Sequence, residues 1–155
     1  MKHLLLSMLF ITTAAQAADP LAIDVYRDPN CGCCKAWIEH LEDNGFAVKD
    51  VVESDMVSVK IRLGVPPEMA SCHTAVIEDR FVEGHVPAAD ILAARARPDL
   101  IGLAVPGMPI GSPGMEMGAR QDPFDVIALD SSGTPEVFNS YPGNLTDSLR
   151  VTGGR

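Results

Sequence analysis

Four cysteines are the residues of this chain whose type and spacing offer the clearest chemistry. Three of them form the cluster Cys31-Gly32-Cys33-Cys34, and Cys72 follows later in the chain. Cys31 and Cys34 have the Cys-x-x-Cys spacing of dithiol redox sites, and Cys33 places a third thiol inside it. Thiolates are also soft ligands that select Cu(I) or Zn(II). The cysteines therefore predict disulfide bonds, dithiol redox chemistry or a site for a soft metal.

The elements on either side of this cluster place it at the turn between a strand and a helix. Residues 21–26 alternate weakly between apolar and polar side chains, which predicts a short strand. From Cys34 onward, apolar residues recur at the three- and four-residue spacing of an amphipathic helix, and Gly45 is suited to its end. Cys34 lies on the apolar stripe of that helix, so we expect it to be buried.

The rest of the chain predicts further strands and helices in a recognisable order. In chain order they are a strand at 46–52, a helix that starts after 54 or 55 and ends before 64, a hairpin of strands at 74–77 and 81–83, a helix from 87 that ends before 98, a loop rich in Gly, Pro and Met at 104–123, and a second hairpin at 125–129 and 136–138. The β-α-β-α-β-β-α order is that of an α/β, thioredoxin-like core, to which the second hairpin adds a C-terminal extension.

In this fold the segment that enters the third strand lies beside the start of the first helix, so Cys72 is expected to face the other three cysteines. Two disulfides are the simplest outcome in an oxidising compartment. A single tetrahedral ion fits less well, because Cys33 and Cys34 project about 100° apart on a helix. Bridging thiolates around several Cu(I) ions tolerate this geometry better. We therefore predict a multinuclear Cu(I)–thiolate site at Cys31, Cys33, Cys34 and Cys72.

Histidines and methionines supply further candidate ligands. His73 adjoins the fourth cysteine and His85 follows the fourth expected strand, and a neutral imidazole there could hold a second ion or a Cu(II) form. Met108, Met115 and Met117 lie in the loop at 104–123, where no helical or strand periodicity explains them. Thioethers are soft ligands for Cu(I). The alternatives are histidines with ordinary hydrogen bonds and methionines that fill gaps in a core.

Length, charge and composition exclude several classes of protein. The chain has 155 residues, which is the size of about one domain. A net charge of −9 leaves no basic surface for a phosphate backbone, and aromatic residues make up only 5% of the chain. We therefore expect a globular protein that does not bind nucleic acid.

The first residues have the pattern of a secretory signal peptide. Lys2 and His3 precede an apolar run at 4–11, and residues 15–17 (AQA) form a small-residue cleavage pattern. The run is shorter than the ~20 residues of a membrane span. We therefore expect a signal peptide at 1–17, a metal-binding domain at 18–138 and a flexible tail at 139–155, in a periplasmic protein with no membrane span after cleavage.

Four motifs then occur in one order, and their combination is far more specific than a Cys-x-x-Cys pair alone. They are CGCCK at 31–35, SCHT at 71–74, EGHVP at 83–87 and GLAVPGMPIGSPGME at 102–116. From Ile23 to about Phe138 the chain resembles the CopG-type family of periplasmic metal-binding, copper-resistance proteins. The resemblance implies a thioredoxin-like fold, copper ligation by the four cysteines, and outer ligands among the loop methionines and His85. It also implies partners among periplasmic copper-efflux or multicopper oxidase components.

The residues and the resemblance together predict a copper-binding protein. We expect it to hold several Cu(I) ions for sequestration, for relay or for Cu(I)/Cu(II) interconversion in copper resistance. We expect a non-enzymatic metal-binding protein, with a copper oxidoreductase as the alternative if the ions change oxidation state. The first alternative is a thiol–disulfide oxidoreductase that uses Cys31 as nucleophile and Cys34 to resolve the mixed disulfide. The second alternative is a structural zinc–thiolate domain.

Overall fold

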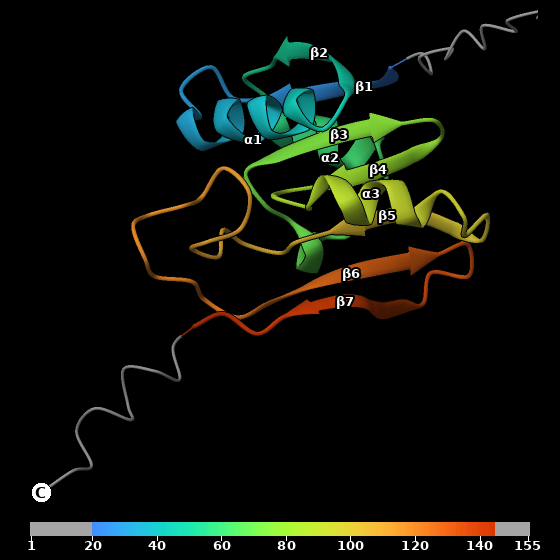
Figure 1. Ribbon diagram of the computed structural model, residues 1–155. Helices are drawn as coiled ribbons and strands as arrows, with labels where there is room; N and C mark the ends of the chain where they lie inside the picture. The colour runs from blue at the N-terminus through green and yellow to red at the C-terminus, as the bar shows by residue number, and fades with distance from the viewer. Residues whose placement is uncertain (1–19, 145–155) are drawn as a thin grey trace, which may run out of the picture.

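The computed structural model describes residues 20–144, which form one seven-stranded sheet with three α-helices and a short 3-10 helix (Figure 1). The strands are β1 (Leu21–Arg27), β2 (Phe46–Val52), β3 (His73–Ile77), β4 (Arg80–Glu83), β5 (Leu100–Ala104), β6 (Phe124–Asp130) and β7 (Pro135–Tyr141). The helices are α1 (Gly32–Asp43), α2 (Met56–Arg62), η1 (Pro67–Met69) and α3 (Ala88–Ala94). The signal peptide expected at 1–17 lies outside the described residues.

The strands follow one another across the sheet in the order β2-β1-β3-β4-β5-β6-β7. β1 pairs in parallel with β2 and antiparallel with β3, and β3 and β4 form an antiparallel hairpin. The predicted α/β class is confirmed, and so is the β-α-β-α-β-β-α order, which runs from β1 to α3 when the short 3-10 helix η1 is left out. The expected C-terminal hairpin is present as β6 and β7 and extends the sheet. The assignment to the thioredoxin-like class stays a prediction.

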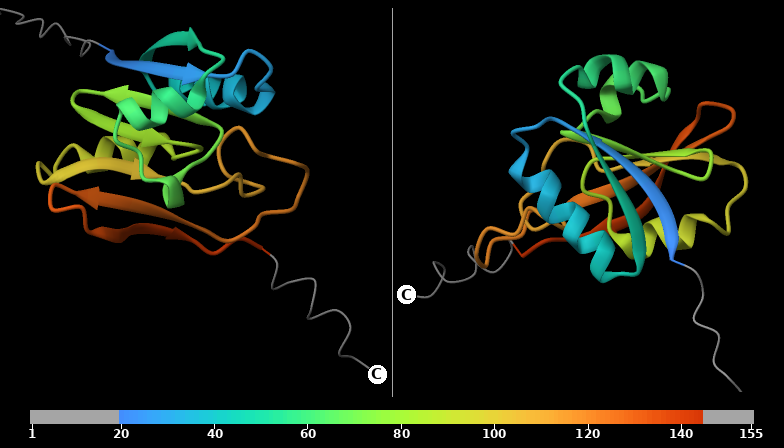
Figure 2. Two further views of the ribbon diagram at one scale, coloured as in Figure 1. Left: turned by 180° about the vertical axis from the view of Figure 1, so that it is seen from behind. Right: turned by 90° about the horizontal axis from the view of Figure 1, so that it is seen from above.

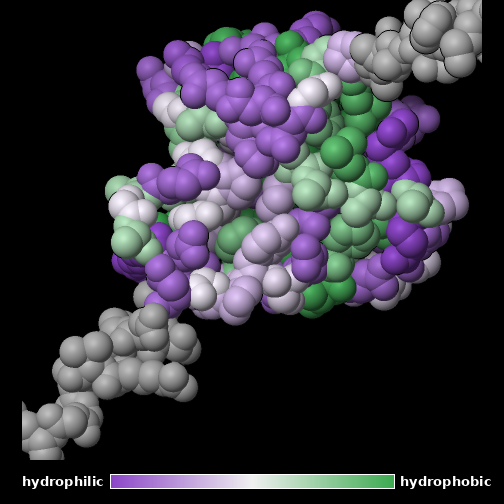
Figure 3. Space-filling view, in the orientation of Figure 1, coloured by the Kyte–Doolittle hydropathy of each residue, from purple (hydrophilic) through white to green (hydrophobic). Residues whose placement is uncertain are grey.

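The helices cover both faces of the sheet. α1 and α3 pack on one face, while α2 lies on the other (Figure 2). The main core lies under α1 and α3, where Trp37, Leu41 and Ile91 are almost completely buried. Each such side chain contributes about 1.5–3 kcal/mol on burial. The outward face of α1 is hydrophilic, as an amphipathic surface helix requires (Figure 3).

Strand β5 is the element that the sequence pattern did not reveal. It pairs in parallel with β4 and antiparallel with β6, so it joins the core to the C-terminal hairpin. Its sequence is a short apolar run in which Leu100, Leu103 and Ala104 are all buried, and such a run lacks the alternation that marks a half-exposed strand. Gly102 is required here, because a Cβ atom would lie 2.3 Å from the Phe81 ring.

The C-terminal boundary also differs from the prediction. β7 continues to Tyr141, whose hydroxyl donates to buried Asp90 at 2.8 Å. Residues 139–141 therefore belong to the sheet and not to the flexible tail expected over 139–155, and the part of that expected tail at 145–155 lies outside the described residues. Across residues 20–144, no helix has the length and apolar character that crossing a membrane would need.

Candidate metal centre

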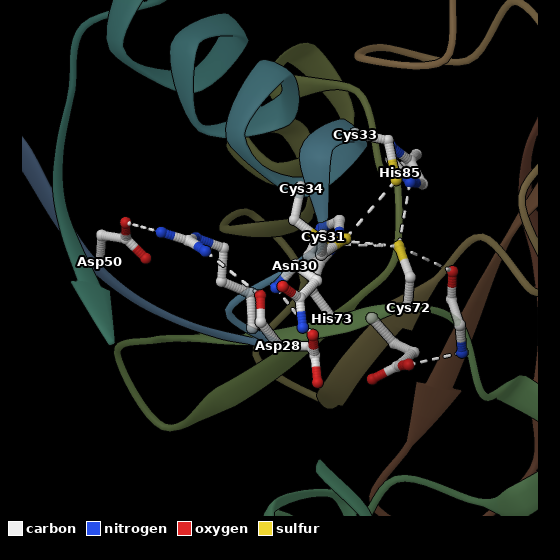
Figure 4. Close-up of a disulfide and its surroundings, with 12 residues drawn as sticks. Asp28, Asn30, Cys31, Cys33, Cys34, Asp50, Cys72, His73 and His85 are labelled. Carbon is white, nitrogen blue, oxygen red and sulfur yellow. Dashed lines mark hydrogen bonds and ion pairs between the residues drawn. A yellow bond between two sulfur atoms is a disulfide. The ribbon is translucent and has the colours of Figure 1, made fainter. Parts of the chain in front are cut away.

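The cysteine cluster lies at the first turn of α1. Cys31 is the N-cap residue of the helix, and its amide donates to the Asp28 carbonyl at 3.2 Å. Cys34 is fully buried on the inner stripe of the helix, as the sequence predicted. In the structure Cys31 and Cys34 form a disulfide, while Cys33 and Cys72 are free thiols (Figure 4). The structure therefore shows the Cys-x-x-Cys pair in its oxidised form.

Cys72, in the segment just before β3, lies next to the cysteine cluster of α1. Its Sγ lies 3.6 Å from Cys34 Sγ, and Cys33 Sγ lies 3.5 Å from Cys31 Sγ. All four sulfur atoms lie within 4.8 Å of one another. This convergence follows from the sheet order, because β3 runs beside β1 and begins one residue after Cys72. The arrangement can hold soft metal ions between the sulfurs once the disulfide is reduced.

Two histidines form a second group of donors with the same cysteine. Cys72 Sγ lies 3.2 Å from His73 Nδ1 and 3.1 Å from His85 Nε2, and these three atoms also lie within 4.8 Å of one another. Both imidazoles have 0% exposure. The Pro113 carbonyl accepts a hydrogen bond from His85 Nδ1 at 2.8 Å, which requires the proton on Nδ1 and directs the lone pair of Nε2 at Cys72.

Burial keeps the donors of this second group uncharged in the metal-free protein. It lowers the pKa of His85, and it lowers the pKa of His73 well below the usual value, with the neighbouring His85 adding to the effect. Burial, together with the nearby Cys33, raises the pKa of Cys72 to about 12. Both imidazoles are therefore neutral near pH 7 and able to act as ligands, whereas Cys72 must lose a proton when a metal binds.

The loop that carries the candidate methionines closes over this site. The Gly107 amide donates to the Ala70 carbonyl at 3.2 Å, and the Gly107 carbonyl accepts a hydrogen bond from the Ser71 hydroxyl. Further along the loop, Gly114 packs against α1 so closely that a Cβ atom would lie 2.9 Å from the Cys33 carbonyl oxygen. The loop therefore contacts both the segment before Cys72 and the helix that carries Cys33.

The three methionines of this loop differ in exposure. Met108 and Met117 are 53% and 64% exposed, and Met115 is half-buried. Met115 directly follows Gly114, the residue that packs on α1. The structure thus places Met115 nearest in sequence to a contact with the cysteine helix, and it leaves the other two thioethers on the surface.

Sequence reasoning missed two residues that shape the site. Trp37 packs its ring 4.4 Å from the His73 ring and donates from Nε1 to the Val86 carbonyl at 2.9 Å. Glu83 is a fully buried carboxylate beneath the Cys72 segment. A charged residue at the end of the apolar strand 81–83 was the signal that could have drawn attention to Glu83, because buried carboxylates are rare without a partner.

Comparison with known proteins also relates this chain to copper resistance proteins. Residues 69–115 match a family described as "Protein of unknown function, DUF411". No curated protein matches the chain. One solved structure, described as copper resistance protein CopG, form 2, is 67% identical; the match covers 79% of this chain and 99% of that one, with a TM-score of 0.78. Form 1 of the same protein is 68% identical over 80% of this chain and 99% of that one, also with a TM-score of 0.78. With these motifs, this cysteine cluster and this level of identity, the chain belongs to the CopG family of copper resistance proteins.

Proposed function

We propose that the protein binds several Cu(I) ions as a thiolate cluster at Cys31, Cys33, Cys34 and Cys72, for sequestration or relay in copper resistance. The observation that carries the proposal is the convergence of the four sulfur atoms within 4.8 Å of one another. Cu(I) accepts two or three thiolate ligands, so bridging sulfurs can share several ions where one tetrahedral ion would meet a poor geometry. The copper resistance function of the homologous structures supports copper as the cargo.

The disulfide between Cys31 and Cys34 must be reduced before this cluster can form, because each sulfur in the bond has lost its thiolate charge. The reduced protein should therefore take up more than one Cu(I) per chain in a titration against a competing chelator. The disulfide form of the same protein is the matched control, and it should bind fewer ions. Saturation of the reduced protein at one ion or fewer would refute the cluster.

The histidines and methionines extend this proposal to the outer part of the site. His85 and His73 would hold a further ion or a Cu(II) form, because Cys72 is shared between them and the thiolate group. Met108, Met115 and Met117 would pass Cu(I) between the site and a partner, with thioethers as uncharged soft ligands. Periplasmic copper-efflux or multicopper oxidase components are the proposed partners. The proposed location is the periplasm, after cleavage behind Ala17.

A thiol–disulfide oxidoreductase is the second candidate, and the Cys31–Cys34 disulfide is the observation that favours it. Metal-free protein should then reduce insulin with turnover in the presence of a dithiol reductant, and a Cys31→Ser variant should not. The copper proposal expects no such turnover. A zinc domain is distinguished by absorption, because Cu(I)–thiolate charge-transfer bands are absent for zinc. Loss of fold on chelation would favour zinc.

A further inference from the structure

The buried carboxylate of Glu83 binds the residues on either side of Cys72 and His73. Glu83 is the last residue of β4 and has 0% exposure. Its Oε1 accepts hydrogen bonds from Lys60 Nζ at 2.5 Å and from the Ser71 amide at 2.6 Å. Its Oε2 accepts from the Thr74 hydroxyl at 2.6 Å. An ionised carboxylate at this depth is tolerated only because these donors and the Lys60 charge compensate for the lost water.

These hydrogen bonds hold both ends of the segment Ser71–Thr74, which carries Cys72. Ser71 precedes Cys72, and Thr74 follows His73. The ladder between β3 and its neighbours begins at His73, so the strand pairing does not fix Cys72 or Ser71. The Ser71 amide is instead held by Glu83, and the Ser71 hydroxyl by the Gly107 carbonyl. The position of the fourth sulfur therefore depends on groups outside the ladder.

Lys60 completes the arrangement from the other face of the sheet. It belongs to α2, and its ammonium group donates to the Thr74 hydroxyl at 3.0 Å as well as to Glu83. The Lys60 side chain is only 16% exposed. The pair thus connects α2, β4 and the start of β3 in one network of hydrogen bonds.

We propose that Glu83 is a positioning residue that holds Cys72 within reach of the other three thiols by binding both ends of the Ser71–Thr74 segment. The proposal rests on the copper site proposed above and names a residue that determines its geometry. Carboxylates that orient metal ligands through intermediate groups typically account for 10–100-fold in metal affinity. Cys72 belongs to both donor groups, so a shift of this sulfur changes both of them.

A Glu83→Gln variant tests the role, because glutamine has one acceptor oxygen and cannot serve Ser71, Thr74 and Lys60 together. We expect faster hydrogen exchange at the Ser71 amide in the metal-free protein and a Cu(I) affinity that is at least about tenfold lower. Asp90→Asn is the matched control. Asp90 is also a buried carboxylate, at 5% exposure, but it binds Asn139 and Tyr141 of β7. This control should leave both the Ser71 exchange and the Cu(I) affinity unchanged.

A second variant keeps the test decisive if Glu83→Gln fails to fold because Lys60 is left without its partner. Lys60→Met combined with Glu83→Gln removes both charges and should still show faster Ser71 exchange and weaker Cu(I) binding. Ser71 exchange and Cu(I) affinity equal to wild type in a folded variant would overturn the proposal. Wild-type protein that binds no Cu(I) cluster would refute the proposed function instead, and the exchange at Ser71 would then decide on Glu83 by itself.

Discussion

Substitution of Gly114 by alanine should separate the loop from the helix that carries the cysteines. Gly114 has a φ of 81°, a left-handed conformation that L side chains rarely adopt. A Cβ atom at this position would lie 2.6 Å from the Trp37 amide nitrogen and 2.9 Å from the Cys33 carbonyl oxygen. Both atoms belong to the backbone of α1, so a small rotation of a side chain cannot relieve the clash.

The expected loss of stability has two parts. The left-handed backbone costs an alanine about 1–2 kcal/mol. Forcing extra volume into a packed contact costs about a further 1–3 kcal/mol. Gly118→Ala is the matched control, because Gly118 in the same loop has a φ of 68° and no atom within 4 Å of its Cβ position. Gly114→Ala should therefore lower the free energy of unfolding by about 2–5 kcal/mol, and the control by about 1–2 kcal/mol.

Urea unfolding of the disulfide form, followed by Trp37 fluorescence, measures both values under one condition. The Cu(I) affinity of the reduced protein should also fall in Gly114→Ala, because a displaced loop withdraws the Pro113 carbonyl that orients His85. It should stay near wild type in Gly118→Ala. Equal losses of stability in the two variants would show that the loop does not press on α1, and the reasoning from this contact would be refuted.

Three other substitutions test different contacts of the structure. Cys72→Ser removes the sulfur that both donor groups share, so Cu(I) uptake in a chelator titration should fall to at most about half of wild type. Trp37→Phe leaves the Val86 carbonyl without its donor and should lower the free energy of urea unfolding by about 1–3 kcal/mol. Burial, with the hydrogen bond to Asp90, raises the pKa of Tyr141 to about 12. Stability should therefore fall as pH rises from about 10 through 12, and less steeply in Tyr141→Phe.

Each of these three predictions has an outcome that contradicts it. Undiminished copper uptake by Cys72→Ser would exclude this sulfur from the site. A Trp37→Phe protein as stable as wild type would mean that the indole N–H contributes nothing. For Tyr141 the sign follows from the unfolded chain, which loses the phenol proton near pH 10 while the folded chain keeps it. An identical decline in wild type and Tyr141→Phe would assign the alkaline loss to other groups.

The sequence predicted the convergence of the cysteines because that convergence depends on strong local patterns. Cys34, Trp37, Ile38 and Leu41 mark the inner face of α1, and all four are buried. Strand order then follows from the alternation of strands and helices, and it brings the start of β3 to the start of α1. The sequence could not reveal β5, since periodicity alone does not distinguish a short buried strand from a buried helix segment in a short apolar run.

The hydrogen-bond network around Glu83 could not be predicted from the sequence for a different reason. It joins residues from α2, β3 and β4 that are far apart in sequence, and the contacts depend on side-chain positions that no periodicity encodes. The same holds for the hydrogen bond from His85 to the Pro113 carbonyl, which fixes the tautomer. A ligand type can be predicted from residue identity, whereas the groups that orient the ligand emerge only when the chain is folded.

The oxidation state of the cysteines decides which donors a metal ion meets. The disulfide removes two of the four thiolates, so it and a four-thiolate copper cluster exclude one another. Cys72, His73 and His85 are untouched by that bond and stay within 4.8 Å of one another. Reduction therefore offers a sulfur-rich site suited to Cu(I), and oxidation leaves a site of two nitrogens and one sulfur, a donor set also found for Cu(II). Cys72 belongs to both donor sets, so the groups that position its sulfur affect both of them.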